Sequence, residues 1–264
     1  MQRLSEFGDA DPDMVFASSA ERDREFAWIF SELVRKNEAI VQDMVTRPKH
    51  NVLSALEKRL ASSLIGKGFI EVRTPIIISK ASLGRMTVTE DSELYGQVFP
   101  IDTKRCLRPM LAPNLYTMMR KLRSRTDGPV RIFEIGPCFR KESKSGEHLE
   151  QFTMLNLVEL GPPGDPADRL NEHIATVMGA AGLKFTTSEE TSEVYGRTLD
   201  VIVNGTEIAS GAVGPHPLDG AHKIYEPWCG IGFGMERMLM SLQRKNNIRK
   251  AAASLTYLNG ERIS

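Results

Sequence analysis

The stretch Arg131-Ile-Phe-Glu-Ile-Gly-Pro-Cys-Phe-Arg-Lys-Glu-Ser-Lys-Ser-Gly-Glu-His-Leu-Glu-Gln-Phe-Thr-Met-Leu-Asn156 lies across two apolar segments separated by charged and small residues. The segments, residues 130–139 and 152–158, predict a long antiparallel hairpin with a polar tip. Arg140 and Glu142 are two residues apart, so at the end of the first strand they are expected to share one face. A guanidinium can bind a phosphate and a carboxylate can accept from an amine, while Phe152 offers a flat ring. The alternative is a solvated hairpin with a charged loop.

The order of these residues resembles motif 2 of the class II aminoacyl-tRNA synthetases. Four strings are similar to the catalytic domain of the pyrrolysyl-tRNA synthetase family: residues 107–116 (LRPMLAPNLY), 133–142 (FEIGPCFRKE), 152–156 (FTMLN) and 232–237 (GFGMER). The resemblance extends from the region of His50 to the C-terminus. It implies an α+β fold, the class II catalytic domain, with a mostly antiparallel sheet surrounded by helices.

The composition is typical of a soluble globular protein, with 41% hydrophobic and 26% charged residues among 264. No apolar run reaches membrane-spanning length, and the N-terminus lacks a signal-peptide core. Three cysteines without CxxC spacing favour a cytoplasmic setting and make a zinc site unexpected. The net charge of zero does not exclude RNA, because local charge matters more than the total, and RNA contacts are expected at the basic patches 120–125 and 244–250, unless these are simply solvated helix ends.

Residues 1–48 are expected to form an N-terminal helical appendage and residues 49–264 the catalytic domain. Apolar residues at near-helical spacing predict one or two helices over residues 19–45. The same pattern predicts a helix over residues 51–67, followed by a strand over residues 69–75 that ends in proline. Helix, strand and proline resemble motif 1 of class II synthetases, which forms the dimer interface in that family.

Between these motifs, residues 79–96 are expected to be loop-rich, and short strands are expected over 97–101 and 105–107. Helices are expected from Ala112 onward and over residues 167–181, and a strand over residues 185–190.

The dipeptide Asn204-Gly205 predicts a hairpin of residues 197–203 and 206–213. On its second strand, Glu207 and Ser210 have an odd separation, which places them on opposite faces of a regular strand. They can share one metal only if a bulge or bend intervenes, which we expect near Gly211.

Glycines alternate at positions 230, 232 and 234, which lets backbone or ligand approach closely. Arg237 follows in the first turn of an expected helix, where the dipole and free amides favour an anion. The spacing is not that of a Rossmann fingerprint, and no P-loop occurs. The segment resembles class II motif 3.

The resemblance implies ATP-dependent activation of an amino acid and its transfer to tRNA, with ATP and Mg²⁺ as cofactors. By matching position, the α-phosphate would be bound by Arg140, the adenine amine by Glu142 and the base by Phe152. The γ-phosphate would be bound by Arg237, so that Arg140, Glu142 and Arg237 are the expected catalytic residues. His148 and Leu149 would lie in the loop that covers ATP, and Glu207 and Ser210 would bind the metal.

The amino-acid pocket is matched by residues of the helix from Ala112, of the return strand and of the glycine-rich strand: Ala112, Leu115, Tyr116, Met119, Asn156, Val158, Trp228 and Gly230, with Tyr195 on a mobile lid. A stripe of methionine and aliphatic residues on that helix is otherwise typical of a core. Asn156 and Val158 should project from one face of the return strand, and the Asn156 amide is the one polar group expected for a long apolar substrate. Its alternative role is to cap or bridge neighbouring backbone.

The implied substrate is pyrrolysine or a related long-chain lysine derivative, carried by a pyrrolysine-type tRNA on a homodimer. The chain is similar to the shorter forms that work without a separate N-terminal tRNA-binding domain. The alternatives are a class II synthetase for phenylalanine or another bulky amino acid, and a synthetase-like RNA-binding protein without catalysis.

Overall fold

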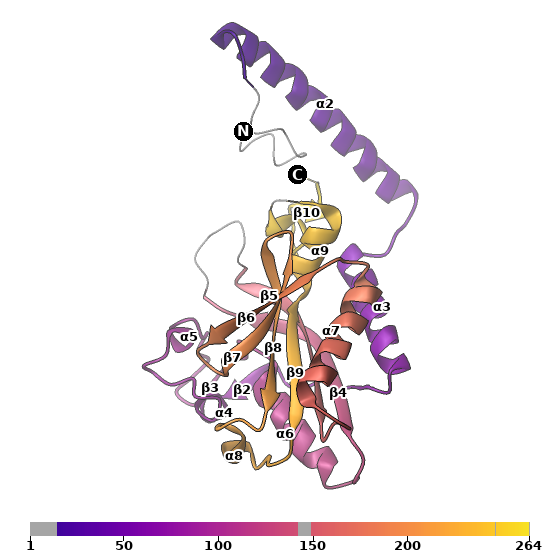
Figure 1. Cartoon of the computed structure of the whole chain (residues 1–264). Coiled ribbons are helices and arrows are strands. Elements are labelled where there is room, and N and C mark those ends of the chain that lie inside the picture. The colour runs from indigo at the N-terminus through magenta and orange to yellow at the C-terminus, as the bar shows by residue number, and fades with distance from the viewer. Residues whose placement is uncertain (1–14, 142–148, 246, 264) are drawn as a thin grey trace.

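A seven-stranded sheet forms the centre of the computed structural model, which describes residues 15–141, 149–245 and 247–263 (Figure 1). The strand order is β1-β4-β5-β9-β8-β7-β6. Only β1 is parallel to its neighbour, and all other pairs are antiparallel. The strands are β1 (Ile70–Glu71), β4 (Val130–Phe139), β5 (Gln151–Leu160), β6 (Thr186–Ser192), β7 (Gly196–Val203), β8 (Thr206–Gly214) and β9 (Trp228–Gly234). The expected α+β class with a mostly antiparallel sheet is confirmed.

The hairpin of β4 and β5 is confirmed, with pairing from Val130↔Leu160 to Phe139↔Gln151. We had expected Arg140 to lie within the end of the first strand. β4 ends at Phe139, however, so Arg140 lies one residue beyond it. The backbone of Arg140 still donates to Glu150 at 3.0 Å, whereas the next amide, of Lys141, turns away and donates to Gln97 at 2.7 Å. Glu142 and His148 lie outside the described residues.

Three helices cover one face of the sheet: α3 (Val52–Gly66), α7 (Pro166–Ala181) and α9 (Met235–Gln243). The strands bury side chains such as Phe133, Leu155 and Phe233 against Leu60 and Ile174 of these helices. Figure 1 shows α3 and α7 packed side by side along the sheet. These helices confirm the expected helical segments at residues 51–67 and 167–181.

The opposite face is covered only in part, by α6 (Ala112–Arg123) and by the hairpin of β2 (Ile77–Ser79) and β3 (Arg105–Leu107). The short helices α4 (Lys80–Gly84), α5 (Glu93–Gly96) and α8 (Asp219–His222) lie around it. This incomplete cover leaves room for a cavity on the sheet.

A single helix, α2 (Ser19–Thr46), extends away from the sheet (Figure 1). It is held near its middle by Asn37, whose side chain exchanges two hydrogen bonds with the backbone of Arg262, at 2.7 and 3.0 Å. Arg262 belongs to the small hairpin of β10 (Tyr257–Leu258) and β11 (Glu261–Arg262), which follows the 3₁₀ turn η1 (Ile248–Lys250). Among the described helices, none is both long and apolar enough to cross a membrane.

Two expected strands are corrected. The strand expected over residues 69–75 is reduced to β1, because the Thr74 amide and hydroxyl bond the Glu134 carboxylate at 3.1 and 2.6 Å and leave the ladder. The strand expected over residues 97–101 is absent from the described structure, where Pro100 makes only an isolated bridge to Cys106. Proline has no amide proton for a ladder, which explains the interruption.

A buried carboxylate joins β4, β5 and α7. Glu159 of β5 is fully buried, and its oxygens accept from Arg131 at 2.7 Å and Arg169 at 3.1 Å, with His173 Nε2 at 2.7 Å. Burial by itself would raise the pKa of Glu159, but the hydrogen bonds from His173 and Arg131 lower it to about 2. The charged form is therefore part of the folded structure.

We expect Glu159→Gln to lower the free energy of unfolding by about 3 kcal/mol, because it leaves two guanidinium groups without their shared counter-charge. Urea denaturation at pH 7 measures this difference. Because the folded pKa is depressed, the contribution is fully present above pH 4.5 and is lost as the pH falls towards about 2. Glu172→Gln removes an exposed partner of Arg169 and should cost under about 1 kcal/mol. An equal gap between wild type and Glu159→Gln at pH 7 and pH 2 would contradict this assignment.

Candidate active site

A cavity of about 560 Å³ opens on the sheet face opposite α3, α7 and α9. Its walls come from β5, β7, β8 and β9, from α6 and from the turn between β6 and β7. Every second residue of β5 from Phe152 to Val158 lines it, as strand alternation requires. The volume is in the range of small-molecule sites.

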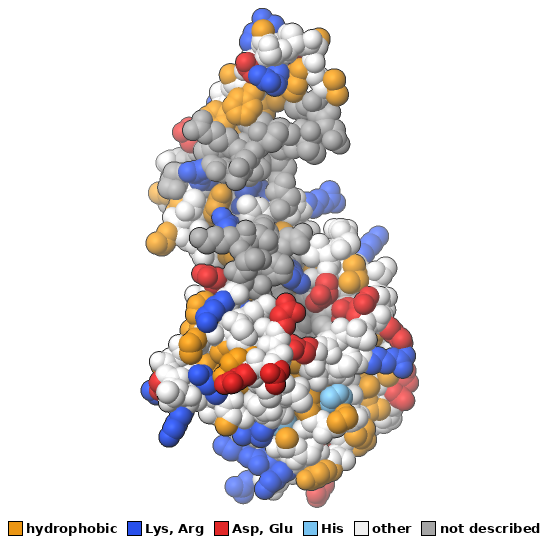
Figure 2. Space-filling model, turned by 90° about the vertical axis from the view of Figure 1, so that its left-hand side faces the viewer, with side chains coloured by type: hydrophobic (Ala, Val, Ile, Leu, Met, Phe, Trp, Pro, Cys, Tyr) orange, Lys and Arg blue, Asp and Glu red, His pale blue; other side chains and the backbone are white. Residues whose placement is uncertain are grey.

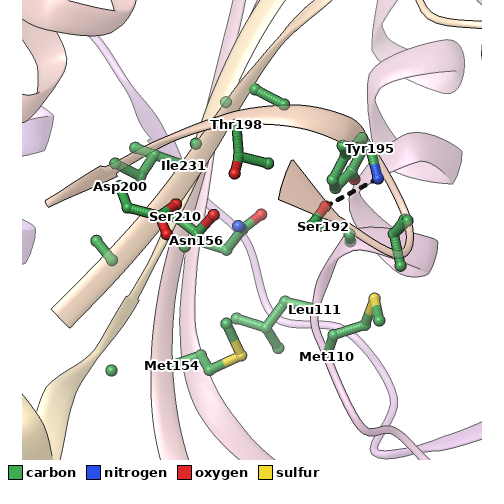
Figure 3. A pocket seen from close by; sticks show the side chains of 18 of the residues that line it. Met110, Leu111, Met154, Asn156, Ser192, Tyr195, Thr198, Asp200, Ser210 and Ile231 are labelled. Carbon is green, nitrogen blue, oxygen red and sulfur yellow. Dashed lines mark hydrogen bonds between the residues drawn. The ribbon is translucent and has the colours of Figure 1, made fainter. Parts of the chain in front are cut away.

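One row of paired residues crosses the cavity floor. Asn156 lies opposite Gly232, Gly232 opposite Ser210, and Ser210 opposite Asp200. Figure 3 shows the side chains of Asn156, Ser210 and Asp200 close to one another, with Met154 and Leu111 lower in the same view. A Cβ at Gly232 would lie 3.0 Å from both Asn156 Nδ2 and Met154 Cε, so glycine leaves that space to the two side chains.

A bulge brings the expected metal ligands to one face. Val201 pairs with Ala209 but Ile202 pairs with Glu207, so Ile208 is the extra residue. Ile208 and Ala209 both pack in the helix-covered core, whereas Glu207 and Ser210 both line the cavity. The bulge lies between the two ligands and not near Gly211, which corrects its expected position.

Asp200 is a site residue that our sequence interpretation missed. It is 9% exposed, lines the cavity beside Ser210, and its Oδ1 has no hydrogen-bond partner in the described part of the chain. Burial raises the pKa of Glu207, the nearby Asp200 carboxylate raises it further, and Arg237 opposes them. A usable signal was present: Asp200 is the one acid in an otherwise apolar strand segment, residues 199–203.

Arg140 lies at the mouth of the cavity beside the ring of Phe152. Its Nε donates to the Pro109 carbonyl at 3.0 Å, and its guanidinium carbon is 5.3 Å from the Phe152 ring centroid. Leu149 also lines this part. The structure thus brings Arg140, Leu149 and Phe152 together as expected.

Arg237 lies in the first turn of α9 and reaches the same cavity. It donates to the Glu207 carbonyl at 3.0 Å, and its Nη1 is 3.9 Å from the Glu207 carboxylate. The neighbouring Glu236 is buried and accepts from the Thr153 amide at 2.8 and 2.9 Å, which ties the start of α9 to β5. Burial raises the pKa of Glu236 to about 7.

The rim of the site is acidic. Figure 2 shows acidic side chains gathered around a hollow on one face, and the cavity lining includes Glu93, Glu193 and Glu207. Arg140 and Arg237 line the same cavity, and a bound cation would offset more of this acidic charge when a highly charged anion binds.

The apolar end of the cavity is formed by the residues expected for the amino-acid pocket: Ala112, Leu115, Tyr116, Met119, Asn156, Val158, Trp228 and Gly230. Leu115, Met119 and Trp228 are almost fully buried. Tyr195 closes one side from the turn between β6 and β7, with its ring 5.9 Å from that of Trp228 in an edge-on contact. That Tyr195 moves as a lid stays a prediction.

Two polar groups of this pocket have different roles. The Tyr116 hydroxyl donates to Asp219 at 2.9 Å, so it is used within the protein and is no free handle for a ligand. Burial raises the pKa of Tyr116, as do Tyr195 and Asp219 nearby. Asn156 is half-buried, and no hydrogen bond joins its amide to another described residue. This argues against the capping alternative.

Some basic side chains of the two patches make contacts within the protein or are buried. Arg123 bonds the Glu226 carboxylate and the Thr126 and Gly128 carbonyls. Lys250 is buried. In the first patch, Arg120, Lys121 and Arg125 remain exposed. In the second patch, Arg244 and Arg249 remain exposed, and RNA contact at the two patches stays a prediction.

Comparisons with known proteins show which family this chain resembles in sequence and in fold. A family model described as the phenylalanyl tRNA synthetase beta chain CLM domain matches residues 38–219. A threonine–tRNA ligase of Wolbachia pipientis is 30% identical over 118 residues, covering 43% of this chain and 18% of that protein. The chain spans only 18–33% of the length of such curated relatives.

Two solved structures match over nearly the whole chain. The crystal structure of a pyrrolysyl-tRNA synthetase from Desulfitobacterium hafniense is 45% identical, covers 99% of this chain and 95% of its own, and has a TM-score of 0.92. A second structure from that organism gives 44% identity, the same coverage and a TM-score of 0.91. The family model reflects the fold shared across the class, and the identity over the whole chain gives the narrower assignment. The chain belongs to the class II aminoacyl-tRNA synthetases, and within them to the pyrrolysyl-tRNA synthetase family.

Proposed function

We propose that this protein activates pyrrolysine, or a related long-chain lysine derivative, with ATP and transfers it to a pyrrolysine-type tRNA. The observation that carries this proposal is one continuous cavity with two chemically different ends. One end holds Arg140, Phe152 and Arg237, and the other is a pocket lined by apolar side chains together with the Asn156 amide. An activated amino acid must join a nucleotide to an acyl group, and this cavity suits both.

In the first step, an oxygen of the amino-acid carboxylate bonds the α-phosphorus of ATP while the bond to pyrophosphate breaks. Arg140 would stabilise charge at the α-phosphate, Arg237 would bind the γ-phosphate, and Phe152 would stack on the base. Glu142 would accept from the adenine amine, and His148 and Leu149 would cover the nucleotide. In the second step, a terminal ribose hydroxyl of tRNA attacks the acyl carbon and AMP leaves.

The residues present fit a magnesium ion. Glu207, Ser210 and Asp200 offer carboxylate and hydroxyl oxygens, the donor set that hard cations prefer. The unpartnered Oδ1 of buried Asp200 supports a ligand there. Mg²⁺ would offset phosphate charge. The chain's own contribution is the Ile208 bulge, which directs Glu207 and Ser210 to the same side.

A homodimer and a separate appendage are further parts of the proposal. Large apolar side chains are exposed along the segment that resembles motif 1 and just after it, with Ile65 at 54%, Ile70 at 55% and Ile77 at 47% exposure. Such a row favours burial against a second copy. A sedimentation mass of one chain at micromolar concentration would contradict this. We also propose that residues 1–48 form an appendage to the domain of residues 49–264. The tRNA would contact the exposed residues of the two basic patches, Arg120, Lys121 and Arg125 in the first and Arg244 and Arg249 in the second.

Pyrophosphate exchange tests the function. We expect magnesium-dependent exchange of pyrophosphate into ATP with an Nε-acylated lysine and none with phenylalanine. Exchange with phenylalanine alone would support a synthetase for bulky amino acids. Absence of exchange with any amino acid, together with retained tRNA binding, would support a non-catalytic RNA-binding protein.

Asp200→Asn and Glu207→Gln should each weaken Mn²⁺ binding in the presence of a non-hydrolysable ATP analogue, by about tenfold or more. Electron paramagnetic resonance of free Mn²⁺ measures this without turnover. Because the pKa of Glu207 is raised, acidification should weaken Mn²⁺ binding at a higher pH than for an ordinary glutamate. Glu189→Gln, at an exposed acid of β6, is the control and should change little. Unchanged Mn²⁺ affinity in Asp200→Asn would remove Asp200 from the site.

Asn156→Ala should weaken activation of amide-bearing lysine derivatives by about ten- to a hundredfold and admit bulky aromatic amino acids. The reason is that the amide is the polar group available to the substrate, and an aromatic side chain would leave it unpaired. kcat/KM for an acylated lysine and for phenylalanine measures both effects. Gln151→Ala, exposed at the start of the same strand, is the control. Equal loss of both activities would make Asn156 structural.

A further inference from the structure

One buried carboxylate lies directly behind the amino-acid pocket. Asp219, in the first turn of α8, is 2% exposed and is absent from the described lining of the cavity. Its Oδ1 accepts from the Tyr116 hydroxyl at 2.9 Å. Its Oδ2 accepts from the Trp228 indole Nε1 at 2.8 Å and from the His216 amide at 2.7 Å.

These three donors come from three different segments. Tyr116 is on α6, Trp228 begins β9, and His216 lies in the loop between β8 and α8. Both aromatic rings line the cavity, so Asp219 reaches the pocket through the side chains that it bonds. A single side chain thereby holds two walls that meet edge-on, with ring centroids 5.8 Å apart.

The same loop reaches the side of the pocket closed by Tyr195. His216 Nε2 is 3.0 Å from the Tyr195 carbonyl oxygen, and the two rings meet edge-on at 5.7 Å. The Trp228 indole also lies against Gly214, where a Cβ would collide with the ring at Nε1, the atom that donates to Asp219. The position of the Trp228 ring therefore depends both on the missing side chain at Gly214 and on the Asp219 carboxylate.

We propose that Asp219 is a positioning residue for amino-acid specificity, which sets Tyr116 and Trp228 directly and Tyr195 through His216. The inference rests on the proposed function. Three donors converge on two acceptor oxygens, and an ionised carboxylate is the side chain that accepts all of them without offering a proton. An asparagine has one acceptor oxygen, so its NH₂ must face either the two N–H donors or the Tyr116 oxygen. In the second arrangement the Tyr116 proton loses its acceptor and turns towards the pocket.

The chain provides its own reporter for this test. Its two tryptophans are Trp28 and Trp228, and Trp28 is 62% exposed on the distant helix α2. In a Trp28→Phe background, tryptophan emission reports on the indole bonded to Asp219. Asp219→Asn should shift this emission in the free protein and weaken its response to an acylated lysine.

In pyrophosphate exchange, Asp219→Asn should raise KM for the amino acid by about tenfold, because hydrogen bonds to charged groups are lost behind the pocket. KM for ATP and kcat should change by less than about threefold, because the nucleotide end of the cavity is untouched. Tyr116→Phe should reproduce part of the rise. In the double variant the two effects should fall short of their product, since both remove the same bond. Asp127→Asn, a surface acid after α6, is the control for loss of charge.

A KM for the amino acid within twofold of wild type, with unshifted Trp228 emission, would overturn the inference. Parallel rises in KM for ATP and the amino acid, with a lower melting temperature, would reduce Asp219 to a structural residue. If Asp219→Asn does not fold, Tyr116→Phe carries the test, and an unchanged KM there overturns it. Wild-type protein inactive with every lysine derivative would instead defeat the proposed function, and the fluorescence measurement distinguishes the two because it needs no turnover.

Discussion

The alternation of side chains along β5 is the constraint on which the rest of the structure depends. β5 is paired on both sides, so each of its residues has a fixed face. Leu155, Leu157 and Glu159 face α3 and α7, while Phe152, Asn156 and Val158 face the cavity. A shift of one residue would exchange these sets and bury the polar groups of the site under the helices. The same strand register therefore fixes both which residues form the core and which residues form the site.

The bulge at Ile208 changes the alternation of side chains within β8. In a regular strand, Glu207 and Ser210 would point in opposite directions, and only one could face the ligand. The extra residue sends Ile208 and Ala209 together into the core and returns Ser210 to the cavity. Apolar burial of Ile208 thus supports the geometry of a polar site on the other face.

Buried acids fall into two kinds in this protein. Glu159 and Asp219 have their oxygens satisfied by neighbouring donors, and both hold segments of the fold together. Asp200 keeps an oxygen without a described partner beside Glu207, whose pKa is raised by burial. Because an unpaired buried polar group is costly, the second kind indicates a place where a ligand completes the structure.

The sequence by itself determined the elements whose signals are local. The β4–β5 hairpin, the Asn204-Gly205 turn, the helices at α3, α6 and α7, and the motifs around Arg140 and Arg237 all follow from neighbouring residues. The other features were decided by the tertiary structure, because each of them depends on contacts between residues that are far apart in the chain. β1 is short because Thr74 bonds the distant Glu134. Arg123 adds little charge to the basic patch because its guanidinium is paired with the Glu226 carboxylate. Asp219 is linked to the pocket only by the tertiary structure, because Tyr116 and Trp228, which are far from each other in the chain, both donate to its carboxylate.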